Sequence, residues 1–280
     1  MTYRRRVLKI NGTDYHLVLL DTNALSEFSK HPQSLREFVT WSLGSKKYVP
    51  CFSSFSILEL RQRIDVFERF KELFGMLGCF LLKGHEDLLQ EEVDSYPDPS
   101  GIVPVSASFT SLGGEGGNLD QVLNTAFGAK SMRDREKYWN EARDSIVDGI
   151  ASRVANFPPD GDTYGPAEER LFVEWAGFEQ IGMRQPEFAK QTLKVSEQHV
   201  DMSAFPSVKA TTYAVWHKFY TNRDRKWDRG DAYDIIISSA IPYMDAVITE
   251  SQMADGLRKT QRVDDFIEDL EIYTLKDFRP

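Results

Sequence analysis

The segment from Asp231 to Glu250 constrains the fold more than any other part of the chain. It contains an apolar run, then Pro242, then the short apolar stretch Ala246-Val247-Ile248, with carboxylates at both ends. Proline ends a helix because it lacks an N–H group and its ring collides with the preceding turn. The segment therefore predicts a buried helix and then a central strand. Its acids would lie where open α/β sheets bind ligands, at the carboxyl ends of strands.

Carboxylates beside an apolar core are destabilising unless a positive charge pairs with them. Asp231 and Asp234 are three positions apart, so they share one face of a helix, and Asp245 and Glu250 flank the strand that follows. A divalent metal ion can pair with several carboxylates at once. The alternative is that Asp231 caps the helix while the other acids are solvated. For four acids around one helix–strand unit, the metal is favoured.

The chain has 280 residues, of which 41% are apolar, enough for a large α/β domain or for a core domain with an insertion. Its net charge of −9 argues against a broad positively charged surface that binds nucleic acid. It does not exclude a metal-dependent nuclease, whose site is itself a cluster of acids. Cys51 and Cys79 lie in apolar surroundings without metal-ligand spacing, which is typical of reduced core residues in a cytoplasmic protein. We expect no membrane span and no signal peptide.

The N-terminal region predicts a β-hairpin followed by a helix. Asn11-Gly12 joins two apolar arms and is the preferred sequence of a tight hairpin turn. The second arm ends in Leu17-Val18-Leu19-Leu20, which is apolar on both faces and predicts a central strand of a covered sheet. Asp21-Thr22-Asn23 follows, in position to cap a helix over Ala24–Ser29.

Further apolar patterns alternate between strands and helices. We expect strands over 47–52, 78–82 and 270–274, the last at an edge, and helices over 32–43, 55–77 and 85–92. Residues 97–117 are rich in Pro, Ser and Gly and predict a linker or lid, and 118–228 is mostly helical in pattern. The division we expect is an α/β core from 1–94 and 206–280, a three-layer sandwich with a mostly parallel sheet, and a helical insertion from 95–205.

The acids that end strands or begin helices form an ordered set. Leu19-Leu20-Asp21-Thr22-Asn23 places an acid at a strand end, and Glu59 lies early in the helix after the next strand. Asp234 then precedes, at matching spacing, a strand that ends in Thr249. This order resembles the PIN-domain nucleases, in the larger PIN-like form with an internal helical insertion. The resemblance covers roughly residues 15–82 and 206–275.

The resemblance implies a nuclease, most often an endoribonuclease, that uses Mg²⁺ or Mn²⁺. Catalytic residues would be Asp21, Glu59 and Asp234. The implied metal ligands are these three with Asp231, Asp245 and Glu250, around one ion or around two spaced roughly 3.5–4 Å apart. Asn23 or Thr249 would position water or phosphate, although helix capping is an equally good role for Asn23. RNA is favoured over DNA as the partner, and a homo-oligomer or an inhibitory partner protein would fit the toxins and defence effectors of this family.

One position departs from the family pattern, because Ser251 stands where members often have a further Asp. Either Glu250 or Asp245 replaces that acid, or one metal site is weakened. Residues 216–229 interleave aromatic and basic side chains, including Arg223, Arg225 and Lys226, a combination that binds single strands by stacking and phosphate contact. A helix that ends in a solvated cationic turn explains this segment equally well.

Two other functions compete with the nuclease. A phosphatase of the haloacid-dehalogenase type also begins with a strand and an Asp, but it needs a second carboxylate where Asn23 stands. The other alternative is a catalytically inactive PIN-like scaffold that binds RNA or protein, which the Ser251 departure supports. Carboxylate-dependent metal binding would distinguish the nuclease from the scaffold.

Overall fold

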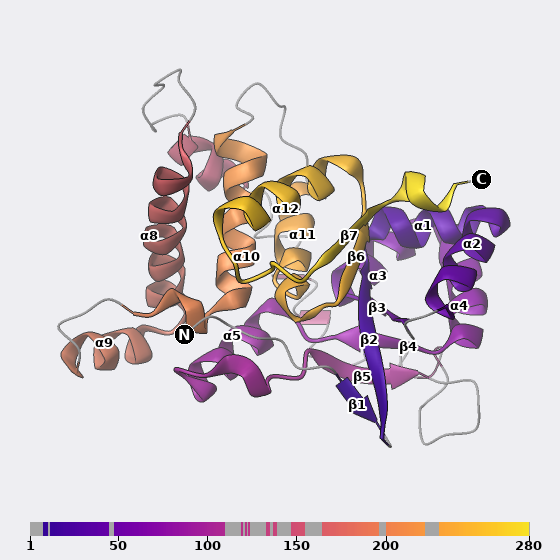
Figure 1. Cartoon of the computed structure of the whole chain (residues 1–280), viewed down its shortest axis with the longest axis horizontal. Coiled ribbons are helices and arrows are strands. Elements are labelled where there is room, and N and C mark those ends of the chain that lie inside the picture. Colours follow the sequence, from indigo (N-terminus) through magenta and orange to yellow (C-terminus); the bar gives the residue numbers. More distant parts are fainter. Residues whose placement is uncertain are drawn as a thin grey trace.

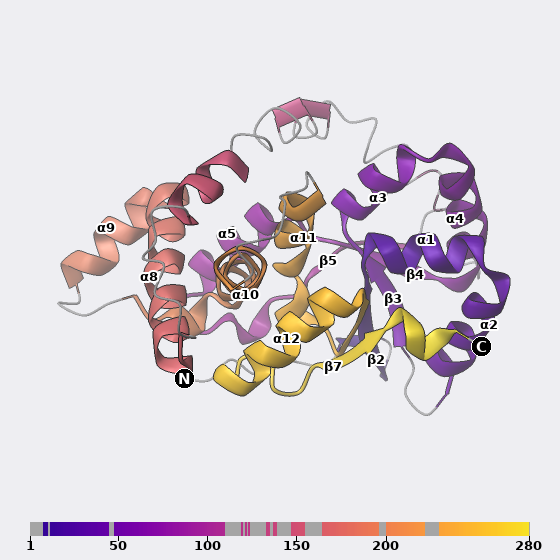
Figure 2. The same cartoon turned by 90° about the horizontal axis from the view of Figure 1, so that it is seen from above.

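A computed structural model describes residues 8–10, 12–44, 48–109, 119, 121, 123, 133–134, 137–138, 147–154, 164–195, 200–221 and 230–279. Its centre is a mostly parallel sheet of seven strands with helices on both faces (Figures 1 and 2). The strands are β1 (Leu8–Ile10), β2 (Thr13–Leu20), β3 (Tyr48–Phe52), β4 (Cys79–Leu82), β5 (Val105–Phe109), β6 (Ala246–Thr249) and β7 (Glu271–Thr274). The α/β class and the mostly parallel sheet are therefore confirmed.

The strand order is β5-β4-β3-β2-β6-β7, and β1 pairs with β2 alone. From β2 the chain builds outward through β3, β4 and β5, and much later it returns to place β6 on the other side of β2. The order thus reverses between β2 and β6, which are parallel neighbours. Such a switch point leaves a crevice at the carboxyl ends of the two strands, because their following helices leave toward opposite faces.

Helices α1 (Thr22–Lys30), α2 (Pro32–Ser42), α3 (Ser54–Arg61) and α4 (Ile64–Leu77) pack together beside one face of the sheet (Figure 2). Beside the other lie α5 (His85–Ser95), α10 (Pro206–Val215), α11 (Gly230–Ser238) and α12 (Ser251–Val263). Helices α8 (Pro166–Arg184) and α9 (Pro186–Val195) stand outside α10, on the side away from α1. Within the described residues, no helix combines the length and apolar character needed to cross a membrane.

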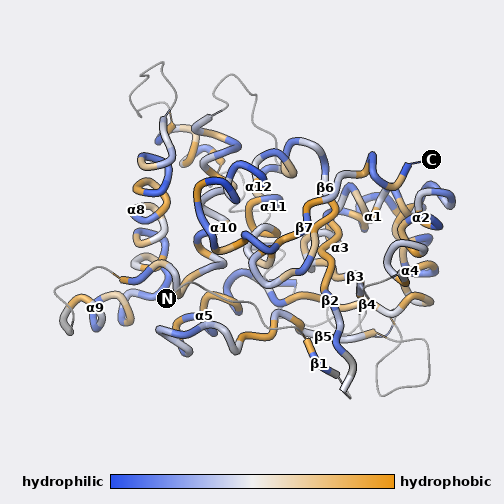
Figure 3. The backbone as a smooth tube through the Cα atoms, viewed as in Figure 1, coloured by the Kyte–Doolittle hydropathy of each residue, from blue (hydrophilic) through white to orange (hydrophobic). Residues whose placement is uncertain are grey.

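The hairpin and the central strand follow the expectation from sequence. Gly12 has a φ of 78° between β1 and β2, a conformation that glycine adopts without strain. Val18, Leu19 and Leu20 are 0% exposed because helices cover both faces of β2. Hydrophobic residues concentrate along the middle of the sheet, whereas α12 is largely hydrophilic (Figure 3). Cys51 and Cys79 are buried and free, as predicted for core residues.

Two expected elements differ from the structure. The single helix over 55–77 is divided into α3 and α4, because Arg63 adopts a non-helical conformation (φ −121°, ψ 82°). The break lets α3 contact α11 at the switch point while α4 packs on α1. The segment 95–205, expected to be a helical insertion, contributes β5, which pairs antiparallel with β4. Its alternating burial is that of an edge strand with one face on the core. Of the helical pattern expected over 118–228, most residues before 147 lie outside the described residues.

Candidate active site

The crevice between β2 and β6 contains Asp21. This residue directly follows β2 and caps α1, accepting a hydrogen bond from the Ala24 N–H at 2.6 Å. Its other carboxylate oxygen accepts from the Thr249 hydroxyl at 2.5 Å and from the Glu250 N–H at 3.2 Å, both at the end of β6. Asp21 is therefore held by the first turn of α1 and by the junction of β6 with α12.

Burial dominates the electrostatics of Asp21, which is only 5% exposed. Loss of hydration and, to a smaller extent, the charge of Asp234 raise the pKa of Asp21 to about 6. The hydrogen bonds from Thr249, Ala24 and Glu250 act against this rise because they stabilise the ionised form. The influence of Asp234 places it within electrostatic reach of Asp21, although 213 positions separate them (234 − 21).

Glu59 approaches the same crevice from α3. Ser53 caps this helix, so Glu59 falls in its second turn, and the Thr22 hydroxyl donates a short hydrogen bond to the Glu59 carboxylate. Burial raises the pKa of Glu59 to about 7, and the charges of Asp234 and Asp21 add to the rise. The three acids predicted to be catalytic thus lie close enough to repel one another.

Asp231 and Asp234 come from the first two turns of α11 and share a cation. The Lys218 ammonium donates to Asp231 Oδ1 at 3.0 Å and to Asp234 Oδ2 at 2.5 Å. The side chain of Asp231 is 1% exposed and that of Lys218 is 7% exposed, whereas Asp234 is 30% exposed and faces the crevice. The pair of acids predicted to share a helix face therefore does so, with a lysine between them.

The crevice is a pocket of about 310 Å³ lined mainly by polar side chains. Its lining includes Thr22, Asn23, Glu59, Arg63, Asp231, Asp234 and Glu250, whereas the buried Asp21 is not one of the lining residues. Carboxylate oxygens are the ligands that Mg²⁺ and Mn²⁺ prefer, so the donor set fits either ion chemically. In the part of the chain that the structure describes, however, no three His, Cys, Asp or Glu side chains converge on one coordination point. Both oxygens of Asp21, and one oxygen each of Glu59, Asp231 and Asp234, accept hydrogen bonds from protein donors.

Asp245 is not part of this pocket, so its prediction as a metal ligand is wrong. Asp245 precedes β6, whereas Thr249 ends it, and each residue of a strand adds roughly 3.3 Å. Its carboxylate accepts from the Leu17 N–H at 2.7 Å and bonds to His16 Nδ1 at 2.9 Å. Asp245 therefore fixes the amino end of β6 against β2, at the edge of the sheet opposite the pocket.

The residues predicted to bind substrate differ in their exposure and in their position relative to the pocket. Asn23 is exposed and lines the pocket, as a substrate contact should. Thr249 is 0% exposed and donates to Asp21, so its hydroxyl orients that acid and does not reach substrate. Arg223, Arg225 and Lys226 lie outside the described residues.

The three described aromatic residues of the segment over 216–229 belong to the core, and the fourth, Trp227, lies outside the described residues. Trp216, Phe219 and Tyr220 are at most 7% exposed, so these rings are inaccessible to nucleic acid bases. Trp216 and Tyr220 both pack against Phe172 of α8. The prediction that these aromatics stack on a single strand is therefore wrong, because the helix buries them against its neighbours.

Sequence reasoning missed three polar residues of the site. Thr22 orients Glu59, Arg63 lowers the pKa of that acid by its charge, and Lys218 pairs the acids of α11. The signal for Lys218 was its position between core aromatics, where a lysine is rare unless paired.

Comparisons with protein-family models, with curated proteins and with solved structures found no match for the chain. The resemblance to PIN-like nucleases stays a prediction from the ordered acids.

Proposed function

We propose that this chain is a metal-dependent nuclease that hydrolyses phosphodiester bonds, an endoribonuclease of the PIN-like type. The observation that carries the proposal is the meeting of Asp21, Glu59 and Asp234 at the switch point of the sheet. They come from three separate parts of the sequence. The charge of Asp234 raises the pKa of both Asp21 and Glu59, and the charge of Asp21 raises the pKa of Glu59. Perturbed carboxylates that gather in one crevice are typical of functional sites.

The roles follow from the contacts of each residue. Asp21, Glu59 and Asp234 would hold Mg²⁺ or Mn²⁺, which when bound supplies an activated water and stabilises the departing oxygen. Thr249 and the Ala24 N–H hold the Asp21 carboxylate in a fixed orientation. The Thr22 hydroxyl does the same for Glu59, and Asn23 offers a neutral hydrogen bond to phosphate or water. Such fixed acids lose little freedom when the substrate arrives.

The choice of RNA over DNA rests on the resemblance alone, as do a homo-oligomer, an inhibitory partner protein and a role as toxin or defence effector. The net charge of −9 gives the chain no broad attraction for either nucleic acid. Substrate binding would therefore depend on metal neutralising the acids of the pocket. We expect weak binding in the absence of divalent ions.

A catalytically inactive PIN-like scaffold is the alternative. Two observations favour it: Lys218 already neutralises part of the charge of Asp231 and Asp234, and Ser251 replaces an acid of the family pattern. A scaffold has no need of metal, so Mn²⁺ binding that depends on the pocket acids distinguishes the two functions.

The decisive experiment is cleavage of labelled single-stranded RNA and DNA with Mg²⁺, Mn²⁺ or EDTA. Glu59→Gln should abolish metal-dependent cleavage. Glu92→Gln is a matched control, because Glu92 is another buried acid whose pKa burial raises to about 7, but it lies outside the pocket. Cleavage that survives EDTA, or that Glu59→Gln leaves intact, would contradict the proposal. Absence of both cleavage and Mn²⁺ binding would favour the scaffold.

A further inference from the structure

The two α11 acids that line the pocket share a buried cation, the ammonium of Lys218, which bonds to both of them from behind the pocket lining. We infer that the Lys218 ammonium takes the place of a second divalent ion at the α11 acids, so that the pocket binds a single divalent ion, beside Asp21 and Glu59. The inference rests on the proposed function and specifies how many ions the site holds.

Lys218 opposes a second ion that would bridge Asp231 and Asp234. Its ammonium is at hydrogen-bond distance from both Asp231 and Asp234, at 3.0 and 2.5 Å. An ion that bridged the same two carboxylates would need the space of the ammonium and would be repelled by its charge. Water cannot easily replace these bonds, because the side chain of Lys218 is only 7% exposed.

The backbone is shaped to place this lysine. After α10 the chain forms a π-helical turn, η3 (Trp216–Tyr220), in which the Thr221 N–H bonds to the Trp216 carbonyl at 3.2 Å. A π-helical turn contains an extra residue relative to an α-helix, and such turns often occur at functional sites. Trp216 and Phe219, buried on either side of Lys218, anchor the turn in the core. Lys218 is therefore held in a fixed position against Asp231 and Asp234.

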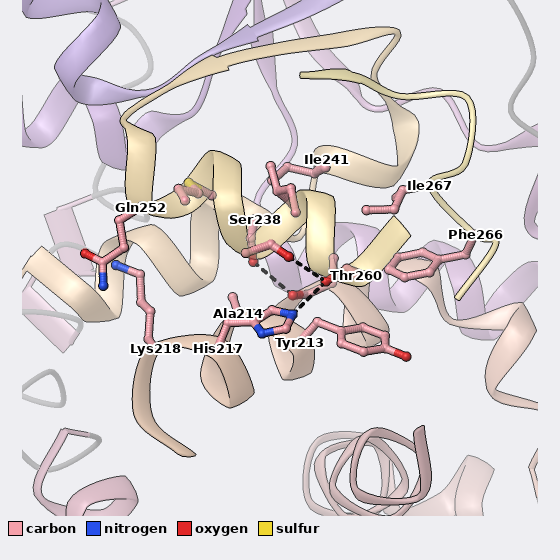
Figure 4. A pocket seen from close by; sticks show the side chains of 14 residues that line it. Tyr213, Ala214, His217, Lys218, Ser238, Ile241, Gln252, Thr260, Phe266 and Ile267 are labelled. Carbon is pink, nitrogen blue, oxygen red and sulfur yellow. Dashed lines mark hydrogen bonds between the residues drawn. The ribbon is translucent and has the colours of Figure 1, made fainter. Parts of the chain in front are cut away.

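The carbon chain of Lys218 lies along a second, mostly apolar cavity of about 50 Å³ (Figure 4). Lys218 and Gln252 lie at one end of this cavity, and Phe266 lies at the other. The stem thus packs on apolar surface while the ammonium reaches the acids, as long basic side chains often do. Methionine at position 218 would keep the apolar packing and remove the charge.

The test counts Mn²⁺ ions bound to the full chain by titration calorimetry, with free Mn²⁺ followed independently by electron paramagnetic resonance. We expect one ion per wild-type chain and two per Lys218→Met chain, because removing the ammonium removes the charge that opposes a second ion at Asp231 and Asp234. Lys209→Met is the matched control. Lys209 is also a largely buried lysine, paired with Asp264 at 2.6 Å outside the pocket, and its loss should leave one ion bound.

Two ions in the wild type, or one ion in Lys218→Met, would overturn the inference and leave the proposed function standing. No Mn²⁺ on the wild type would overturn both, so the two failures are distinguishable. Lys218→Gln serves the same purpose if the methionine variant does not fold, because glutamine still donates hydrogen bonds without charge. The number of Mn²⁺ ions bound to the wild type tests the inference even if no variant folds.

Discussion

The Thr249 hydroxyl donates a hydrogen bond of 2.5 Å to the Asp21 carboxylate, although 228 positions separate the two residues. This bond joins the carboxyl ends of β2 and β6, which pair in parallel from Val18 with Ala246 to Leu20 with Ile248. The position of Asp21 therefore depends on strand pairing as well as on the helix that it caps. Any variant that disturbs this junction should affect the site and the stability of the sheet together.

Asp21→Asn should abolish Mn²⁺-dependent cleavage and change stability in a manner that depends on pH. The pKa of Asp21 is raised from 3.8 to about 6, so the native state binds its proton more tightly than the unfolded chain does. The wild type therefore loses stability as the pH rises from about 4 through 6. This loss is roughly 3 kcal/mol, at about 1.4 kcal/mol for each pKa unit, and the variant avoids it.

Asparagine at position 21 should also lower the free energy of unfolding through the loss of a hydrogen bond. Its one acceptor oxygen cannot serve both the Ala24 and the Glu250 N–H groups, which costs about 1–3 kcal/mol. The variant should be less stable than the wild type near pH 4 and close to it at pH 7. Thermal melts in EDTA at both pH values measure this difference. Parallel stability curves would show that the pKa of Asp21 is not raised in the native state. Full cleavage activity would show that Asp21 is not catalytic.

Asp245→Asn should lower stability and leave cleavage intact. Asp245 is as buried as Asp21, at 5% exposed, but its partners are the Leu17 N–H and His16 at the opposite edge of the sheet. Weakening these bonds should cost about 1–3 kcal/mol of unfolding free energy. Urea unfolding and the Mn²⁺-dependent rate, measured side by side, check both parts. A variant that folds normally but lacks cleavage activity would show that Asp245 is needed for catalysis.

Glu92→Gln should make stability less dependent on pH. Glu92 is 0% exposed and accepts hydrogen bonds from the Ser207 N–H, the Ser207 hydroxyl and the Tyr243 hydroxyl. Burial raises its pKa from 4.5 to about 7, so its contribution to stability is full below about pH 4.5 and is lost as the pH rises through 7.

Between pH 4.5 and pH 8 the wild type should lose on the order of 3 kcal/mol of unfolding free energy through Glu92, at about 1.4 kcal/mol for each pKa unit. The glutamine variant should therefore show a flatter curve of urea midpoint against pH than the wild type does. Equal slopes in the two proteins would mean that Glu92 titrates normally in the native state.

Elements that depend on local chemistry could be read from the sequence. The hairpin needed only a turn glycine between two apolar arms, and Asp21 and Ser53 cap α1 and α3 through bonds to residues three positions later. The break between α3 and α4 was missed because no proline or glycine marks it. The edge strand β5 was missed because a short alternating stretch lay within a segment otherwise rich in loop and helix signals.

Local sequence patterns are enough to place acids after the buried strands, because strand and helix ends are set by near neighbours. Which acids meet depends on the fold of the whole chain. Asp245 and Glu250 flank the same strand, yet β6 carries them to opposite edges of the sheet, and only Glu250 lines the pocket. Lys218 reaches Asp231 through the packing of η3 on α8 and α11. Such contacts depend on strand order and helix packing, which join residues that no local pattern relates.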